Sequence, residues 1–235
     1  IQKFEMDARY SFISVAIWWI GFALYTFYYL PDKDRNGEER KNVLFKGFHE
    51  IKKVWVELKT IPRLKRFLFS FFIYSMGVQT VMLMAVLFAK KEISGLDDSS
   101  LIIAVLLIQF VGVGGSFLFS FISSKIGNIK ALGVALFIWV FICIGTYLWC
   151  YTANGFYIVA SAVGLVMGGI QALSRSTYSK LLPETEDHSS YFSFYDVCEK
   201  IGIVIGMLSF GFIEGITGGM RNSILALITF FVIGL

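Results

Sequence analysis

The stretch that decides the fold runs from Gly168 to Lys200 and reads GGIQALSRSTYSKLLPETEDHSSYFSFYDVCEK. It joins two apolar segments, yet it places polar and charged side chains inside those segments or at their ends, namely Gln171, Arg175, Asp196, Glu199 and Lys200. One charge at mid-bilayer costs about 2.5–3.5 kcal/mol on insertion scales, so a cluster needs partners, water or a function. We interpret this stretch as the centre of a transport pathway. The alternative is structural, with Arg175 reaching the headgroups and an Asp196–Lys200 pair that stabilises the fold.

Composition places the chain among polytopic membrane proteins. Hydrophobic residues make up 56% of its 235 residues, and it contains only three prolines. This length accommodates about seven crossings of about 20 residues each, together with one long loop. We therefore expect an all-α membrane helical bundle.

Apolar runs predict the membrane spans and their orientation. Lys and Arg gather in the loops on one side, which the positive-inside rule places in the cytoplasm. The chain begins at Ile1 without Met and stops within an apolar run, so we expect a fragment whose last helix is truncated. The predicted spans are Tyr10–Leu30, Phe67–Ala89, Ser99–Ile122, Ala131–Tyr151, Phe156–Leu181, Tyr191–Ile213 and a seventh from Asn222 onward.

The loop from Asp32 to Arg66 differs from the rest of the chain because its basic residues outnumber its acidic ones. Within it, apolar residues recur at three- and four-residue steps, which predicts an amphipathic helix on the inner membrane face. We expect a linker that tethers two bundles, with a partner-binding segment as the alternative. The apolar positions are Leu44, Phe48, Ile51, Trp55 and Leu58, and the lysines placed to meet lipid phosphates are Lys52, Lys53 and Lys59.

Polar residues are unevenly distributed among the spans. The second, third, fifth and sixth spans carry nearly all of them, which predicts four helices around a polar interior and two outside it. Asp196 and Lys200 stand four apart, a spacing at which opposite charges meet on a helix. With Glu199 beside them, one carboxylate is left as a candidate proton carrier, and a permanent salt bridge is the alternative. The polar residues are Gln79, Thr80, Gln109, Gln171, Ser174, Arg175, Asp196, Glu199 and Lys200.

Other function classes find little support in the sequence. The formal net charge of +4 is concentrated in one loop, which argues against a nucleic-acid partner. Cys143, Cys150 and Cys198 lack any metal-ligand spacing, so we expect packed thiols and no metal. His49 and His188 fall in predicted loops and receive no role. Neither a nucleophile elbow nor a phosphate loop occurs, so we expect no enzyme and no cofactor.

Several motifs resemble the vacuolar-effluxer-like branch of the major facilitator superfamily, which contains autophagy-related vacuolar amino-acid effluxers and bacterial relatives. They are FLFSFFIYSMGVQTV (67–81), GGIQALSRSTYSKLLP (168–183), YFSFYDVCEKIGIVIG (191–206) and TGGMRNSILAL (217–227). The resemblance implies two six-helix halves that rock around a central cavity. It assigns 1–30 to the last helix of the first half, 31–66 to the central loop, and 67–235 to the second half. The sequence departs from the family's pattern at two positions. Ser124 stands where the superfamily usually has an acid, and Glu199 stands where many relatives carry a small residue.

These inferences lead to one functional hypothesis, a secondary transporter for amino acids or similar zwitterions with proton coupling. We expect a monomeric, multi-pass protein of a bacterial inner membrane, or of the vacuolar membrane if the source is eukaryotic. The partners are then the lipid bilayer, a small solute and a proton. A non-transporting receptor or scaffold and a membrane-embedded transferase are the alternatives. The expected substrate-binding residues are Gln79, Thr80, Gln109, Gln171, Arg175 and Tyr195, and the expected coupling or gating residues are Asp196, Glu199 and Lys200.

Overall fold

The computed structural model describes residues 8–30, 43–93, 95–184 and 187–235. These ranges are almost entirely helical and contain no strand, which confirms the predicted all-α class. The helices are α1 (Ala8–Tyr29), α2 (Val43–Glu57), α3 (Pro62–Glu92), α4 (Asp98–Ile126), α5 (Asn128–Trp149), α6 (Ala153–Leu181), α7 (His188–Thr217) and α8 (Met220–Gly234), with a single 3-10 turn (Leu58–Thr60) between α2 and α3.

The chain forms two compact units, Ile1–Phe45 and Lys46–Leu235. The first unit contains α1, an apolar helix whose aromatic side chains, among them Trp18 and Trp19, are exposed. The second unit contains α2 from Lys46 onward and the bundle of α3 to α8. It holds every residue predicted for the functional site.

Helix length and composition confirm a multi-pass membrane protein. Among the residues that the structure describes, six helices are long and apolar enough to span a bilayer, namely α1 and α3 to α7. The apolar helix α8 has 15 residues and is shorter. Several helices continue past the predicted apolar runs: α3, for example, has 31 residues. Such polar ends extend a helix from the hydrocarbon core into the headgroup region.

Short turns join the helices of the bundle, and local chemistry sets their positions. Asp97 and Asp187 cap α4 and α7, because their carboxylates accept backbone N–H bonds from Ser100 and Ser190 at 3.0 and 3.2 Å. Gly127 separates α4 from α5 with a φ of 86°, a region that favours glycine. These turns place consecutive helices antiparallel.

Glycines bring α4 and α6 into direct backbone contact. A Cβ atom added at Gly115 would overlap the Leu165 carbonyl, and one at Gly168 would overlap the Gly112 carbonyl. A similar approach joins α7 to α3, where a Cβ at Gly206 would lie 2.6 Å from the Met76 carbonyl oxygen. Small residues at these crossings permit van der Waals packing between backbones inside a membrane.

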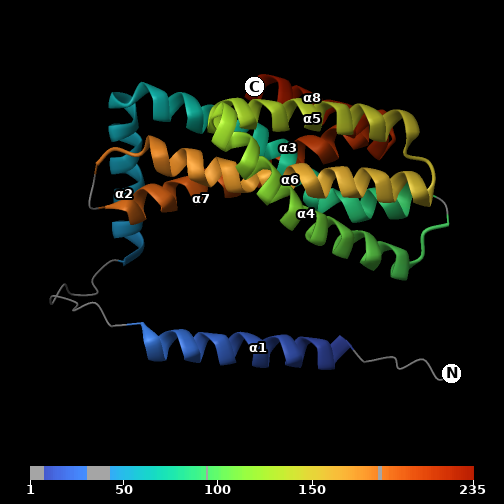
Figure 1. Cartoon of the computed structure of the whole chain (residues 1–235), viewed down its shortest axis with the longest axis horizontal. Coiled ribbons are helices and arrows are strands. Elements are labelled where there is room, and N and C mark those ends of the chain that lie inside the picture. Colours follow the sequence, from blue (N-terminus) through green and yellow to red (C-terminus); the bar gives the residue numbers. More distant parts are fainter. Residues whose placement is uncertain (1–7, 31–42, 94, 185–186) are drawn as a thin grey trace. The chain divides into compact units, whose positions relative to one another are not determined.

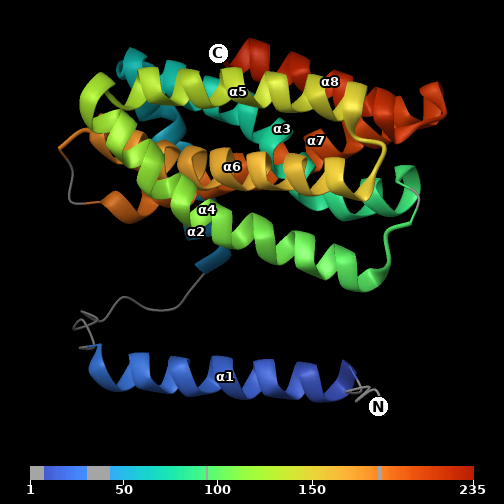
Figure 2. The same cartoon turned by 45° about the vertical axis from the view of Figure 1, so that its right-hand side comes forward.

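Helix α2 crosses the end of the bundle at which α3 and α7 begin and α6 ends (Figure 1 and Figure 2). This end is called the α2 end below, and the opposite one the far end. Val54 and Leu58 of this segment are buried, and Ile51 is partly buried against the core. Val54 was not among the predicted apolar positions. Phe48 and Trp55 are exposed instead, and the side chain of Leu44 lies outside the described residues.

Candidate substrate cavity

A polar cavity of about 360 Å³ lies between α3, α6 and α7, in the half of the bundle nearer the α2 end. Residues 168–175, which open the decisive stretch of sequence, form one wall, and the close approach at Gly168 lets α6 pack on α4 behind it. The polar lining consists of Tyr74, Ser75 and Gln79 from α3, Gln171, Ser174 and Arg175 from α6, and Tyr195 and Glu199 from α7.

Gln79 and Glu199 connect α3 with α7 at this cavity. The Gln79 amide donates a hydrogen bond to the Glu199 carboxylate, and both side chains are half-buried. A hydrogen bond to an ionised carboxylate is among the stronger ones in proteins, particularly where water is scarce. The contact gives Glu199 one protein partner and leaves it on the cavity wall.

Tyr74 and Ser174 connect α3 with α6. Their hydroxyl oxygens are 2.7 Å apart, and the Ser174 hydroxyl also donates to the Ile170 carbonyl at 2.5 Å. Because a serine hydroxyl has a single proton, Tyr74 is the donor in the first of these bonds. Ser174 was noted as polar in the sequence, but neither residue was predicted as a site residue.

Arg175 and Asp196 form an ion pair between α6 and α7, with Nη2 and Oδ1 3.4 Å apart. Their side chains are 64% and 54% exposed, and the guanidinium carbon lies 6.0 Å from the centre of the Tyr195 ring. The Asp196–Lys200 pair, which helical spacing allows and which was one alternative, does not form, since Asp196 turns toward α6. Lys200 is exposed and has no ion-pair partner among the described residues.

An aromatic layer lies on the side of the polar cavity nearer the α2 end. Tyr195 stacks on Phe71 with ring centres 4.1 Å apart, and Tyr178 lies 4.9 Å from Tyr195. The Tyr178 hydroxyl donates to the Tyr191 carbonyl at 2.7 Å, which holds α6 against the first turns of α7. Phe71 and Tyr178 were not predicted as site residues, and aromatics at three- and four-residue steps in 67–74 fit a lipid-facing position as well as such a layer.

The remaining predicted residues do not line this cavity. Thr80 is fully buried and packs against Gly206, and its hydroxyl has no hydrogen-bond partner among the described residues. Gln109 is exposed on α4. The predicted interior formed by four helices is thus a cavity formed by three, because α4 turns its glycine face toward α6. Within the described residues, the cavity unites Gln79, Gln171, Arg175, Tyr195 and Glu199.

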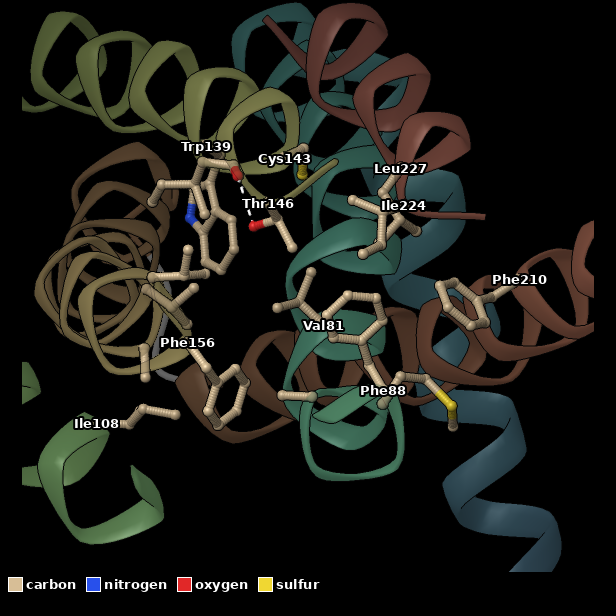
Figure 3. A pocket seen from close by; sticks show the side chains of 16 residues that line it. Val81, Phe88, Ile108, Trp139, Cys143, Thr146, Phe156, Phe210, Ile224 and Leu227 are labelled. Carbon is tan, nitrogen blue, oxygen red and sulfur yellow. Dashed lines mark hydrogen bonds between the residues drawn. The ribbon is translucent and has the colours of Figure 1, made fainter. Parts of the chain in front are cut away.

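A second cavity, of about 60 Å³, lies toward the far end and is apolar (Figure 3). Its lining comes from α3 to α8 and includes Phe88, Trp139, Phe156 and Phe210. Thr146 also lines it, but its hydroxyl donates to the Ile142 carbonyl of its own helix at 2.7 Å. The sequence did not predict this cavity.

Comparisons with known proteins agree with these features. The family model described as "Vacuole effluxer Atg22 like" matches residues 1–235. The uncharacterized MFS-type transporter YxiO of Bacillus subtilis is 27% identical over 228 residues, covering 97% of this chain and 52% of that protein. Autophagy-related protein 22 of Vanderwaltozyma polyspora is 28% identical over 267 residues, covering 100% of this chain and 50% of that protein.

A further relative gives the same picture. Autophagy-related protein 22 of Cryptococcus neoformans (strain B-3501A) is 29% identical over 241 residues, covering 92% of this chain and 43% of that protein. The chain spans about half the length of these curated relatives. It belongs to the Atg22-like vacuole effluxer family, a family of major facilitator superfamily (MFS) type transporters.

Proposed function

We propose that this chain supplies half of a secondary active transporter, which moves amino acids or similar small zwitterions by alternating access. The observation that carries the proposal is a polar cavity with both charge signs, built among helices that are otherwise apolar. A positive Arg175 on α6 and a negative Glu199 on α7, both lining this cavity, match the carboxylate and ammonium groups of a zwitterion. The names of the relatives, an MFS-type transporter and autophagy-related protein 22, support a transporter.

The proposed roles follow from each residue's position. Arg175 binds the solute carboxylate, which replaces Asp196 as the partner of the guanidinium. A guanidinium recognises carboxylates through paired N–H donors. Gln171 and Tyr195 contact the remaining polar groups. Since Gln171, Arg175 and Asp196 are exposed, we propose that their surface faces the other half of the complete protein.

The coupling proposal places the proton on the α7 carboxylates. Glu199 is in contact with Gln79, and Asp196 with Arg175, so protonation of either acid would release a link between α7 and a neighbouring helix. Each contact would then have two states, formed and broken, as alternating access requires. Lys200, which is unpaired among the described residues, joins this group as a gating residue. Thr80 acts on packing between α3 and α7, and Gln109 contributes from α4.

Transport by the full-length protein reconstituted in liposomes tests the proposal. Arg175→Ala should abolish uptake of a panel of radiolabelled amino acids, and Arg175→Lys should retain part of it. Lys125→Ala serves as a control, because it removes a charge from an exposed site at the end of α4. If Arg175→Ala transports at the wild-type rate, the assigned site is wrong.

The same experiment separates the transporter from a receptor or scaffold that kept the fold. A scaffold would tolerate substitutions in the cavity and lose function with substitutions in the segment before α3. For the location, we propose a bacterial plasma membrane, with the vacuolar membrane as the alternative that the fungal relatives suggest. We also propose that the protein acts as a monomer, which size-exclusion chromatography with light scattering would test.

A further inference from the structure

Exposed residues of α2 and the turn after it form a stripe of alternating aromatic and basic side chains. Phe48, Lys52, Trp55 and Lys59 follow at steps of four, three and four residues, which place them on one side of a helix. All four are exposed, with Phe48 at 70% and Trp55 at 59%. This set is called the α2 stripe below.

The acidic residues of α2 point away from the stripe and toward α7. Glu50 accepts a hydrogen bond from the Ser190 hydroxyl at 3.3 Å, and Glu57 accepts one from the Tyr191 hydroxyl at 2.7 Å. Neither Lys52 nor Lys59 forms an ion pair with any residue that the structure describes. The helix therefore keeps its negative charges on the bundle side and leaves two positive charges on the stripe.

The position of α2 brings the stripe to the level of a membrane surface. The helix runs across the ends of the spanning helices rather than along them, so its axis lies roughly parallel to the membrane plane (Figure 1). The Trp55 ring lies 6.1 Å from the ring of Phe194, which belongs to the second turn of α7. Trp55 is thus level with the first turns of a span, where headgroups meet acyl chains.

We propose that the α2 stripe binds anionic phospholipid headgroups at the α2 end of the bundle. Trp and Phe are suited to the headgroup boundary, where an aromatic ring meets both water and acyl chains. Lysines between them reach lipid phosphates, and each basic residue near an anionic surface raises affinity by about fivefold. Two lysines on one stripe predict a preference of about thirtyfold for anionic over zwitterionic lipid. The site does not depend on the transported solute.

Hydrogen exchange of the full-length protein in nanodiscs tests this lipid site. Amides of residues 47–60 are compared in discs of phosphatidylcholine and in discs that contain equal parts of phosphatidylcholine and phosphatidylglycerol. We expect slower exchange of this segment in the anionic discs. The effect should disappear in the double variant Lys52→Gln, Lys59→Gln and persist in Lys52→Arg, Lys59→Arg.

Lys53→Gln is the matched control, since it removes the same charge from the same helix. The sequence grouped Lys53 with Lys52 and Lys59, but in the structure Lys53 lies off the stripe. Hydrogen bonds from Ser190 and, to a smaller extent, the charge of Lys53 lower the pKa of Asp187. This variant should keep the full lipid effect. Equal exchange in the two kinds of disc would overturn the proposal, as would an anionic effect that survives in the double glutamine variant. The proposal would also be overturned if inorganic phosphate added to phosphatidylcholine discs slowed exchange as much as anionic discs do, because the site would then bind free anions.

Discussion

Two cavities described above have opposite character, although α3, α6 and α7 contribute to both. The cavity nearer the α2 end holds about 360 Å³ and carries charged, amide and hydroxyl groups. The one toward the far end holds about 60 Å³ and is lined by aromatic and aliphatic side chains (Figure 3). α3 shows the change within one helix, from Tyr74 and Gln79 to Val81 and Phe88.

This difference indicates that the two ends of the helices have different roles. Packed apolar contacts at the far end fix how the helices cross, whereas polar contacts near the α2 end are few, directional and exchangeable. A solute or a proton can compete with a hydrogen bond or ion pair, but it cannot replace a stacked aromatic core. Substitutions in the two regions should therefore affect different measurements.

The largest effect is expected from Glu199→Ala. It removes a cavity carboxylate and leaves the Gln79 amide without its acceptor, so transport should fall by about a hundredfold, equivalent to about 3 kcal/mol. Counterflow in liposomes measures this. Glu214→Ala, which removes the same side chain from the far end of the same helix, should retain transport. Loss of transport in both variants to the same degree would remove the distinction between the two regions.

Trp139→Ala tests the apolar region and should act on stability instead. Trp139 is fully buried and stacks on Phe231 with ring centres 5.3 Å apart, so truncation leaves a large void. We expect a loss of about 3 kcal/mol in the free energy of unfolding with solute affinity retained. Chemical denaturation in detergent measures it, and Trp149→Ala, at a side chain that is 78% exposed, is the control. A stability unchanged in Trp139→Ala would argue against a packed far end.

Arg221→Lys should have a moderate effect at the far end. The Arg221 guanidinium donates to the Thr146, Tyr147 and Cys150 carbonyls at 3.1, 3.0 and 2.8 Å, which caps the C-terminus of α5. Lysine keeps the charge near the helix dipole but cannot make the same set of bonds. A loss of about 1–2 kcal/mol is expected from these contacts, with transport maintained. An equal melting temperature for the variant and wild type would show that the cap contributes nothing.

The smallest expected effect is on the acid sensitivity of the fold, and it involves the two capping carboxylates, one near each end of the bundle. Hydrogen bonds from Ser190 lower the pKa of Asp187, and hydrogen bonds from Ser100 lower that of Asp97. A carboxyl with a lowered folded-state pKa stabilises the fold above its unfolded pKa of about 4 and loses that contribution as pH falls further. Melting curves between neutral and acidic pH should therefore show less acid sensitivity in Asp187→Asn and Asp97→Asn. Unchanged acid sensitivity in both variants would contradict this.

The sequence was sufficient for the fold and for most of the cavity, because both depend on local pattern. Apolar runs and short turns predicted the spans. Polar residues such as Gln171 and Glu199 are costly in a bilayer and indicated where a polar cavity would lie. Small residues at four-residue steps, such as Gly164 and Gly168, are a sequence pattern that permits close helix approach in a membrane.

Partner choice could not be predicted, because it depends on how the helices are rotated. Helical spacing favoured Lys200 as the partner of Asp196, but α6 places Arg175 nearer. Thr80 is next to Gln79 in the sequence, yet it faces Gly206 rather than the cavity. The aromatic layer around Tyr195 was missed because aromatic residues also suit lipid-facing positions, and the sequence alone does not distinguish the two.

Water accessibility of single cysteines tests the polar cavity most directly. With Cys143, Cys150 and Cys198 replaced, Gln171→Cys is compared with Phe137→Cys, at an apolar side chain of α5 that is 57% exposed. Both are treated in intact membranes with a charged, membrane-impermeant thiol reagent applied from each side. Gln171→Cys is expected to react and to be protected by transported solute, whereas Phe137→Cys should stay unlabelled. Equal labelling at both positions, or none at Gln171→Cys from either side, would contradict a water-accessible cavity between α3, α6 and α7.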